Sequence, residues 1–305
     1  MSTYTDASLI VTPNGKKAGK LYALKGADLD VVRATTATYV DADGVIQTAL
    51  ANEPRFDYTN GSCPSILVEP QRTNLLTYSE YFSNASWNKI LSTVNLNAII
   101  SPSNELNANE IVSTSTANTF FQISSSNISR TSTQYSQFFY FKNNNLSSTD
   151  TIQFAALISN ATNECRVRLN PETMEFVSQT VNGDFSNFSY SVVSFPDNWF
   201  QVIINFTIST TPTVFLSRVT AIVTTGIIKS FFLWGAQLEA GANATSYIPT
   251  VASTVTRNAD VISKTGLSGI NTITETFEDD TTNVISGSPT SYTMSQGRIK
   301  HVIGL

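Results

Sequence analysis

The sequence predicts an all-β protein whose main domain is an antiparallel β-sandwich, most simply a jelly roll. From about residue 75 to residue 250, short runs of β-favouring residues alternate with Asn, Ser, Thr, Gly and Pro, as in strands joined by turns. Residues 202–208 are apolar at every second position, with Asn205 and Thr207 between, so one face of this strand should meet a core. Long amphipathic helical periods are missing from the sequence.

The N-terminal segment, residues 1–65, is predicted to be a small β-rich piece for attachment or oligomerisation. Its strand candidates are 8–11, 20–24, 29–32, 35–40 and 45–47, which are too few and too short to bury much surface alone. The Asp41-Ala-Asp-Gly44 stretch resembles the start of a calcium loop, but the later carboxylate ligands are missing, since Glu53 stands in the wrong place. We expect a turn at this position.

Residues 66–250 are the predicted sandwich domain. A β-favouring run at 66–68 is ended by Pro70, and an extended crossing segment follows, in which Arg72 and Asn74 are suited to bonding carbonyls of neighbouring loops. The strand candidates of the domain are 92–97, 110–112, 120–123, 134–141, 151–156, 165–169, 173–179, 188–195, 199–207, 213–218 and 227–238.

Residues 251–305 are predicted to be a C-terminal β segment. Its strand candidates are 261–264, 272–278 and 298–303. A tail of this length is too small for a core of its own, so we expect it to pack on the N-terminal segment or on a neighbouring subunit.

Composition and charge exclude several classes of function. Charged residues make up 13% of the chain, against roughly 25% in ordinary soluble domains. The net charge of -5, without a cluster of Lys or Arg, argues against a nucleic-acid partner. We expect no membrane insertion, because no apolar run approaches the roughly 20 residues that span a bilayer. The N-terminus lacks the features of a signal peptide.

The sequence offers little for catalysis, metals or cofactors, and we expect none of the three. With His301 as the single histidine, no Ser-His-Asp triad can form elsewhere. Cys63 and Cys165 match no zinc or redox spacing, and residues 278–280 are better explained as a solvated acidic hairpin tip than as a calcium site. A glycan hydrolase would need two facing carboxylates. The sequence cannot pair the available ones, which are Glu69, Glu80, Glu105, Glu110, Glu164, Glu172, Glu175, Asp184 and Glu239.

Five stretches carry a resemblance to a known family. They are Leu67-Val-Glu-Pro-Gln-Arg-Thr-Asn-Leu-Leu76, Tyr78-Ser-Glu-Tyr-Phe-Ser-Asn-Ala-Ser-Trp87, Trp234-Gly-Ala-Gln-Leu-Glu239, Ala244-Thr-Ser-Tyr-Ile-Pro-Thr250 and Thr254-Val-Thr-Arg-Asn-Ala-Asp260. In this order they resemble bacteriophage virion proteins whose tail fibres, head fibres and spikes carry a lectin-like jelly roll similar to concanavalin and carbohydrate-binding modules. The resemblance spans roughly 55–260, and Tyr81 departs from it where an acidic residue is common.

The resemblance implies a structural protein of the virion surface, a spike or fibre, that binds host-surface carbohydrate for adsorption. Its partners would be its own copies, in a trimer, together with other virion proteins and a host glycan. It would be made in the host cytoplasm without a signal peptide. The alternatives are a purely structural decoration or spike-base protein without a ligand and, second, a glycan hydrolase.

Aromatic rings and amide or hydroxyl side chains are the groups with which a lectin-like sandwich holds a sugar. As candidate carbohydrate-binding residues the sequence offers Tyr78, Tyr135, Tyr140 and Tyr190. We expect core positions for Phe82, Trp87, Trp199 and Trp234.

Overall fold

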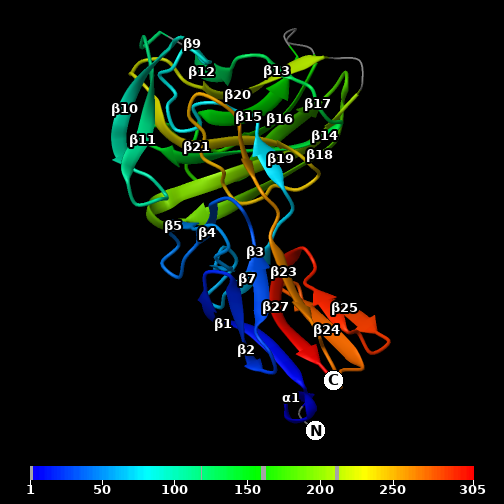
Figure 1. Ribbon diagram of the computed structural model, residues 1–305. Coiled ribbons are helices and arrows are strands. Elements are labelled where there is room, and N and C mark those ends of the chain that lie inside the picture. The colour runs from blue at the N-terminus through cyan, green and yellow to red at the C-terminus, as the bar shows by residue number, and fades with distance from the viewer. Residues whose placement is uncertain (1–2, 118, 159–162, 210–212) are drawn as a thin grey trace. The chain divides into compact units, whose positions relative to one another are not determined.

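A computed structural model describes residues 3–117, 119–158, 163–209 and 213–305, and the chain divides into two compact units (Figure 1). Unit 1 consists of Met1–Arg72 and Thr256–Leu305, and unit 2 consists of Thr73–Val255. The described elements are strands, apart from a one-turn helix, α1 (Thr3–Asp6), and a short 3-10 helix, η1 (Pro196–Asn198). The predicted fold class, all-β with an antiparallel sandwich, is confirmed.

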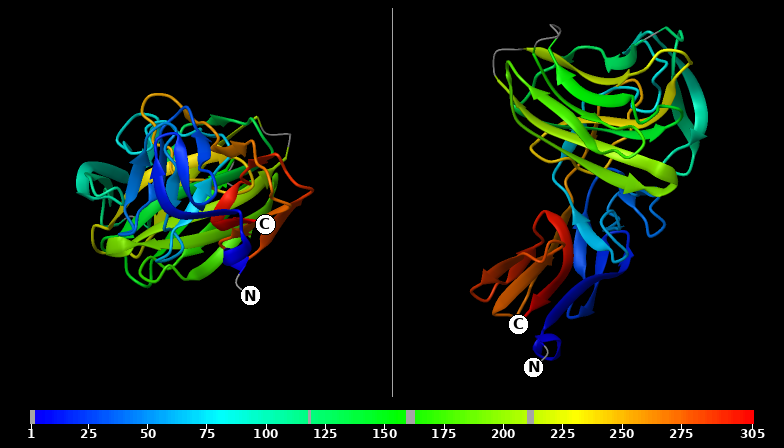
Figure 2. Two further views of the ribbon diagram at one scale, coloured as in Figure 1. Left: turned by 60° about the horizontal axis from the view of Figure 1, so that its bottom comes forward. Right: turned by 180° about the vertical axis from the view of Figure 1, so that it is seen from behind.

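Unit 2 is the sandwich, and its two sheets form facing layers (Figures 1 and 2). The six-stranded sheet has the order β10 (Ser92–Ile100), β11 (Leu106–Ser113), β21 (Ser230–Ala240), β14 (Gln134–Asn143), β19 (Trp199–Ile208), β18 (Phe185–Phe195). The seven-stranded sheet has the order β17 (Phe176–Val181), β16 (Glu164–Leu169), β15 (Thr151–Leu157), β20 (Val214–Ile222), β12 (Phe120–Ser125), β9 (Trp87–Ile90), and β13 (Ile128–Ser129) also pairs with β20.

Alternating apolar residues from both sheets fill the space between the layers. In β19, Val202, Ile204 and Phe206 are buried, whereas Asn205 and Thr207 are partly exposed, as the sequence alternation predicts. The side chains predicted to be core are also confirmed, since Phe82, Trp87, Trp199 and Trp234 are all buried.

Unit 1 combines strands from the two ends of the chain in one antiparallel sheet. Its path is β25 (Thr282–Ser286), β24 (Thr272–Phe277), β27 (Gly297–Gly304), β1 (Leu9–Lys17), β2 (Lys20–Lys25), β3 (Leu29–Val32), β23 (Val261–Thr265), β26 (Ser291–Thr293). Off this path, β7 (Ser65–Val68) pairs with β27 and with β6 (Arg55–Asp57). Strands β1 and β27 therefore lie side by side, as Figure 1 shows in blue and red. A separate hairpin joins β4 (Ala37–Val40) to β5 (Ile46–Ala49).

The β4–β5 hairpin confirms the predicted turn at residues 41–44. Asp41 Oδ1 accepts hydrogen bonds from the backbone N–H groups of Asp43 and Val45, at 3.0 and 2.9 Å. Because the carboxylate bonds its own loop, the stretch forms an Asx-type turn. Among the described residues, no three His, Cys, Asp or Glu side chains are grouped as metal ligands would be.

Unit 1 also holds a buried ion network, defined here as Arg33, Arg55, Glu69, Arg257 and Asp260. Arg55 pairs with both carboxylates, Arg33 with Asp260 at 2.7 Å, and Arg257 with Glu69. The Asp260 carboxylate also accepts the backbone N–H of Glu69, at 2.9 Å. Glu69, Arg257 and Asp260 come from the stretches that carry the family resemblance, so these motif residues serve the fold.

The chain passes between the units at two short strands, β8 (Arg72–Asn74) and β22 (Val255–Arg257). In unit 2, Asn74 bonds loop carbonyls as predicted, since its Nδ2 donates to the backbone oxygens of Ala236 and Ile248, at 3.0 and 2.9 Å. Arg72 Nη1 donates only to its neighbour Gln71, at 3.0 Å.

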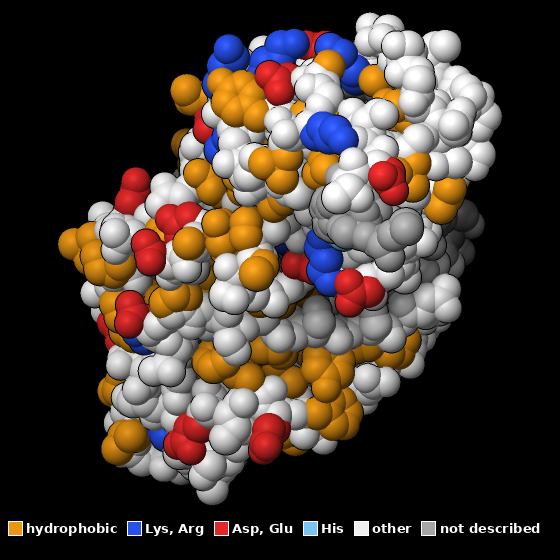
Figure 3. Space-filling view, turned by 90° about the horizontal axis from the view of Figure 1, so that it is seen from below, with side chains coloured by type: hydrophobic (Ala, Val, Ile, Leu, Met, Phe, Trp, Pro, Cys, Tyr) orange, Lys and Arg blue, Asp and Glu red, His pale blue; other side chains and the backbone are white. Residues whose placement is uncertain are grey.

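The surface agrees with the low charge of the sequence. The face in Figure 3 is largely uncharged, and its Lys and Arg side chains are interspersed with acidic and apolar ones. Cys63 is exposed and Cys165 is buried, and neither forms a disulfide. No helix among the residues that the model describes has the length and hydropathy needed to span a bilayer.

Candidate binding face

Strand register places two rows of side chains on the outer face of the seven-stranded sheet. Phe154, Val167 and Val219 point into the core, so the residues that alternate with them face outward. One outward row, from β16 through β15 and β20 to β12, is Arg168, Gln153, Thr220, Gln122. The adjacent row is Arg166, Ala155, Arg218, Ser124. We call the outward residues of these rows the binding face.

A pocket of about 320 Å³ opens on the binding face. It is lined by Thr119, Phe120, Gln122, Gln153, Arg166, Arg168, Arg218, Thr220 and Ile222. Ala155 lies between Arg166 and Arg218 in the register, so the residue directly between them has only a methyl side chain. Phe120 is 37% exposed at this pocket, which leaves part of its ring accessible to a ligand.

One buried carboxylate holds two of the three arginines. Glu164 pairs with Arg166, and it accepts from Arg218 Nη2 at 3.1 Å. The third arginine, Arg168, donates from Nε to Gln153 Oε1 at 3.1 Å. Three guanidinium groups against one carboxylate leave this cluster with a net charge of two positive units.

The positive charges of neighbouring arginines lower the pKa of Arg168 and of Arg218. Burial lowers the pKa of Arg218, and the charges of Arg166 and Arg168 lower it further, against the opposing effect of Glu164. Burial and the charge of Arg166 also lower the pKa of Arg168. The Nε of Arg218 is buried without a hydrogen-bond partner. The binding face therefore keeps both positive charge and a donor that the protein does not satisfy.

Two of the four predicted tyrosines belong to the core. Tyr135 is fully buried, and its hydroxyl accepts backbone N–H groups of Thr131 and Ser132, at 2.6 and 2.8 Å. Tyr140 is also buried, in edge contact with Trp234 at a centroid distance of 5.2 Å. Neither ring offers a face on which a sugar could stack, because protein atoms cover both.

Tyr78 and Tyr190 are partly buried and lie apart from the binding face. Tyr78 packs against the core, and its carbonyl accepts Trp87 Nε1 at 3.1 Å. Tyr190, on β18, stacks on Phe176, with a centroid distance of 5.8 Å and an interplanar angle of 18°. Phe176 is 52% exposed, so this pair presents aromatic surface. The four tyrosines do not form a common site.

The arginines of the binding face were missed by sequence reasoning. A signal existed in Glu164-Cys-Arg-Val-Arg-Leu169, where two arginines alternate with apolar residues on one strand. Gln153 reaches the same face through pairing of the consecutive strands β15 and β16, whereas Arg218 reaches it through the pairing of β15 with the distant strand β20. Their proximity could not be obtained from spacing in the sequence.

One pair of the candidate hydrolase carboxylates lies close together. Asn107 Nδ2 donates to Glu80 Oε2 at 3.2 Å and to Glu105 Oε2 at 3.3 Å. Burial raises the pKa of Glu80, the hydrogen bond from Tyr247 at 2.9 Å lowers it, and the charge of Glu105 raises it, with a net upward direction. By contrast, Glu69, Glu164 and Glu239 are buried and already bound to protein donors.

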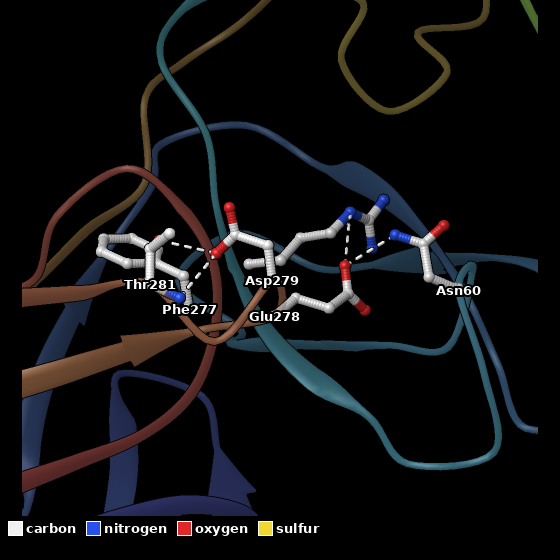
Figure 4. Close-up of a pocket in the computed structure, with 6 residues that line it drawn as sticks. Asn60, Phe277, Glu278, Asp279 and Thr281 are labelled. Atoms are coloured by element: carbon white, nitrogen blue, oxygen red, sulfur yellow. Dashed lines mark hydrogen bonds and ion pairs between the residues drawn. The ribbon is translucent and has the colours of Figure 1, made fainter.

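A second pocket, of about 590 Å³, lies in unit 1 beside the acidic hairpin tip (Figure 4). Glu278 accepts from Asn60 Nδ2 at 2.6 Å, and Asp279 accepts from the backbone N–H of Thr281 at 3.0 Å. Asp280 pairs with Lys300 at 2.5 Å. Each carboxylate thus has a donor within the protein, as a hydrogen-bonded hairpin tip requires.

No protein-family model matches this chain, and no curated protein is similar to it at a significant level.

Proposed function

We propose that this chain is a surface protein of a bacteriophage particle, a spike or fibre, whose sandwich binds carbohydrate on the host cell for adsorption. The resemblance of the five sequence stretches supports the virion part of the proposal. The observation that carries the binding part is the pocket on the binding face, where amide, hydroxyl and guanidinium groups stand beside an exposed phenyl ring.

These groups match the chemistry of a saccharide. Sugar hydroxyls donate and accept hydrogen bonds, and the side chains of Gln122 and Gln153 can do both. Guanidinium groups add donors, and the exposed part of Phe120 can contact the apolar C–H groups of a sugar ring. The volume, about 320 Å³, lies at the lower end of the range for small-ligand pockets.

The proposal includes assembly. Several copies on one symmetric particle would combine weak sites into strong attachment, and we propose a trimer joined to other virion proteins. In this proposal the chain is made in the host cytoplasm, acts on the virion surface and binds without catalysis.

The test is binding of the full-length protein to an array of bacterial surface glycans and to intact host cells, together with its molar mass by light scattering. Saturable binding that free sugar competes away is the expected result. If a correctly folded oligomer binds neither glycans nor cells, the carbohydrate part of the proposal fails, and the structural decoration protein becomes the better account.

A second candidate function is glycan hydrolysis, favoured by the amide-bridged pair Glu80 and Glu105. The upward pKa shift of Glu80 would suit a general acid, and Glu105 would serve as the second carboxylate. Release of reducing sugar ends that disappears in Glu80→Gln would establish this function. Intact glycan after prolonged incubation with the wild-type protein would exclude it.

A further inference from the structure

The guanidinium groups of the binding face have unused donors. A guanidinium group has five N–H donors. Within the described part of the chain, the side chain of Arg168 makes one hydrogen bond, from Nε to Gln153, so both Nη groups remain free to bind a ligand. The Nε of Arg218 is buried with no acceptor. The protein supplies donors here in excess of the acceptors that it provides.

The charges of the side chains at the pocket, like their unused donors, favour a ligand that supplies acceptors. Glu164 is the carboxylate that pairs with these arginines, and none of the residues lining the pocket is acidic. Repulsion among the three guanidinium groups lowers the pKa of Arg168 and of Arg218 beyond the effect of burial. An anion in the pocket would relieve this repulsion and would accept charge-assisted hydrogen bonds, which are stronger than neutral ones.

Neutral groups beside the arginines indicate more than a simple ion. Gln153, Thr220 and Gln122 continue the row that begins at Arg168, one residue per strand. Thr220 Oγ1 donates to Gln122 Oε1 at 3.4 Å, and Gln122 lines the pocket, so its Nε2 donors, which bond no other described residue, are available to a ligand. A ligand that meets this row needs an anionic group at one end and hydroxyls along its length.

A nucleic acid fits less well than a saccharide. Its backbone presents many evenly spaced phosphates, whose binding needs a basic stripe, while this chain has a net charge of -5 and gathers its pocket arginines at one place.

We propose that the ligand of the binding face is an acidic saccharide, whose carboxylate or phosphate group binds Arg168 and Arg218 while its hydroxyls bond the partly exposed Gln122. The inference rests on the proposed function and specifies the class of glycan. Arg168 is the residue to test, since it makes no ion pair with any residue that the structure describes, and its loss leaves Glu164 paired with its two arginines.

The experiment measures the affinity of the full-length protein for bacterial polysaccharides that contain uronate, sialate or phosphate groups, immobilised on an array. Each polysaccharide is paired with its carboxyl-reduced or dephosphorylated form, and duplex DNA is included. The variants are Arg168→Gln, Arg168→Lys and, as a matched control outside the pocket lining, Arg130→Gln. Circular dichroism and melting curves establish that each variant is folded.

We expect binding to at least one acidic polysaccharide, lost on neutralising its anionic group and weakened by added salt. Arg168→Gln should lower this affinity by about ten- to a hundredfold, Arg168→Lys should retain part of it, and Arg130→Gln should leave it unchanged. The paired polysaccharides show whether the anion is a carboxylate or a phosphate.

Four results would overturn the inference. Equal binding of acidic and neutralised forms would show a neutral glycan as ligand and would leave the proposed function standing. Equal losses of affinity in Arg168→Gln and Arg130→Gln would show that the ligand does not bind in this pocket. DNA binding as tight as glycan binding would show that the site does not select a saccharide. Absence of binding to any glycan would end both the inference and the proposed binding function.

Discussion

Two groups of three arginines, one in each unit, show what distinguishes a structural charge cluster from a site open to a ligand. In unit 1, Arg33, Arg55 and Arg257 share two carboxylates, and their side chains are almost completely buried. In unit 2, the three arginines of the binding face line a pocket, and among the described residues Glu164 is the carboxylate that pairs with two of them. Arginine therefore stabilises the fold where the protein supplies enough counter-charges, and it remains available to a ligand where the protein does not.

The position of the carboxylates explains the difference in role. Asp260 bonds Arg33, Arg55 and the backbone of Glu69, and thus joins segments that are distant in sequence. Glu164, in contrast, bonds Arg166 from its own strand and Arg218 from a strand of the same sheet. The first network fixes a fold, and the second orients two side chains on one surface.

Breaking the buried network should have the largest effect. Asp260→Asn removes the carboxylate that pairs with buried Arg33 and leaves buried Arg55 with Glu69 alone, so we expect unit 1 to lose about 3 to 5 kcal/mol of stability. Thermal unfolding followed by calorimetry checks this. The exposed Asp43→Asn serves as a control, and its melting curve should match the wild type. Equal melting of all three proteins would show that the network contributes nothing.

The sandwich also contains a buried ion pair of one acid and one base, Asp150 and Lys229, whose contribution to stability can be tested by varying the pH. Burial raises the pKa of Asp150, but Lys229 Nζ at 2.9 Å and the N–H groups of Ser147 and Thr224 lower it to about 2. Because this folded pKa lies below the unfolded value of 3.8, stability is present above about pH 4 and is lost as the pH falls towards 2. We expect a loss of about 2 kcal/mol from this group.

Urea midpoints of the wild type and Asp150→Asn at a series of pH values from neutral to acid measure this contribution. The variant should be less stable at neutral pH, because it leaves Lys229 buried without its carboxylate, and its stability should fall less steeply in acid. Parallel pH profiles for the two proteins would contradict the assignment.

Removing the carboxylate of Glu164, which pairs with two arginines of the binding face, should lower stability less than breaking the buried ion network or the Asp150–Lys229 pair. In Glu164→Gln, Arg166 and Arg218 keep contact with water, so we expect a loss of about 1 to 2 kcal/mol. The added positive charge should at the same time strengthen binding of an acidic glycan. Weaker glycan binding by a folded variant would show that Glu164 is needed to orient the arginines.

The smallest effect on stability is expected for Arg168→Gln. The side chain gives up one hydrogen bond to Gln153 and no ion pair, so the free energy of unfolding should change by no more than about 0.5 kcal/mol. Chemical denaturation measures it, with Arg130→Gln alongside. A loss comparable to that of Asp260→Asn would mean that the binding face is a structural cluster like the one in unit 1.

The sequence predicted the parts of the molecule that depend on local pattern. Alternation in β19 gave the inward and outward residues correctly, because one face of a sandwich strand meets the core. The same reasoning could not rank the tyrosines. Strand β14 is buried on both faces, with Tyr135 towards the core and Tyr140 packed against Trp234 and Tyr247 on the other side. The coverage of that outer face depends on segments distant in sequence.

The residues of the binding face could not be predicted from the sequence, for a related reason. Arg166 and Arg168 alternate on one strand and meet Gln153 on the preceding strand, but Thr220 and Arg218 become their neighbours through the register of β15 and β20. Pairing between strands more than 50 residues apart is set by the whole fold.

The pairing of β27 with β1, β7 and β24 has a consequence for biosynthesis. A ribosome delivers residues 73–255 before β27, so the sandwich, a continuous segment, is able to close while β1 still lacks its neighbour. Until β27 pairs with β1, the N-terminal strands have unpaired edges, which are open to proteolysis and to pairing with other chains. A polypeptide whose synthesis stopped after residue 255 but before β27 would have a folded sandwich and an incomplete sheet in unit 1. The sheet of unit 1 is thus completed only after β27 has been translated.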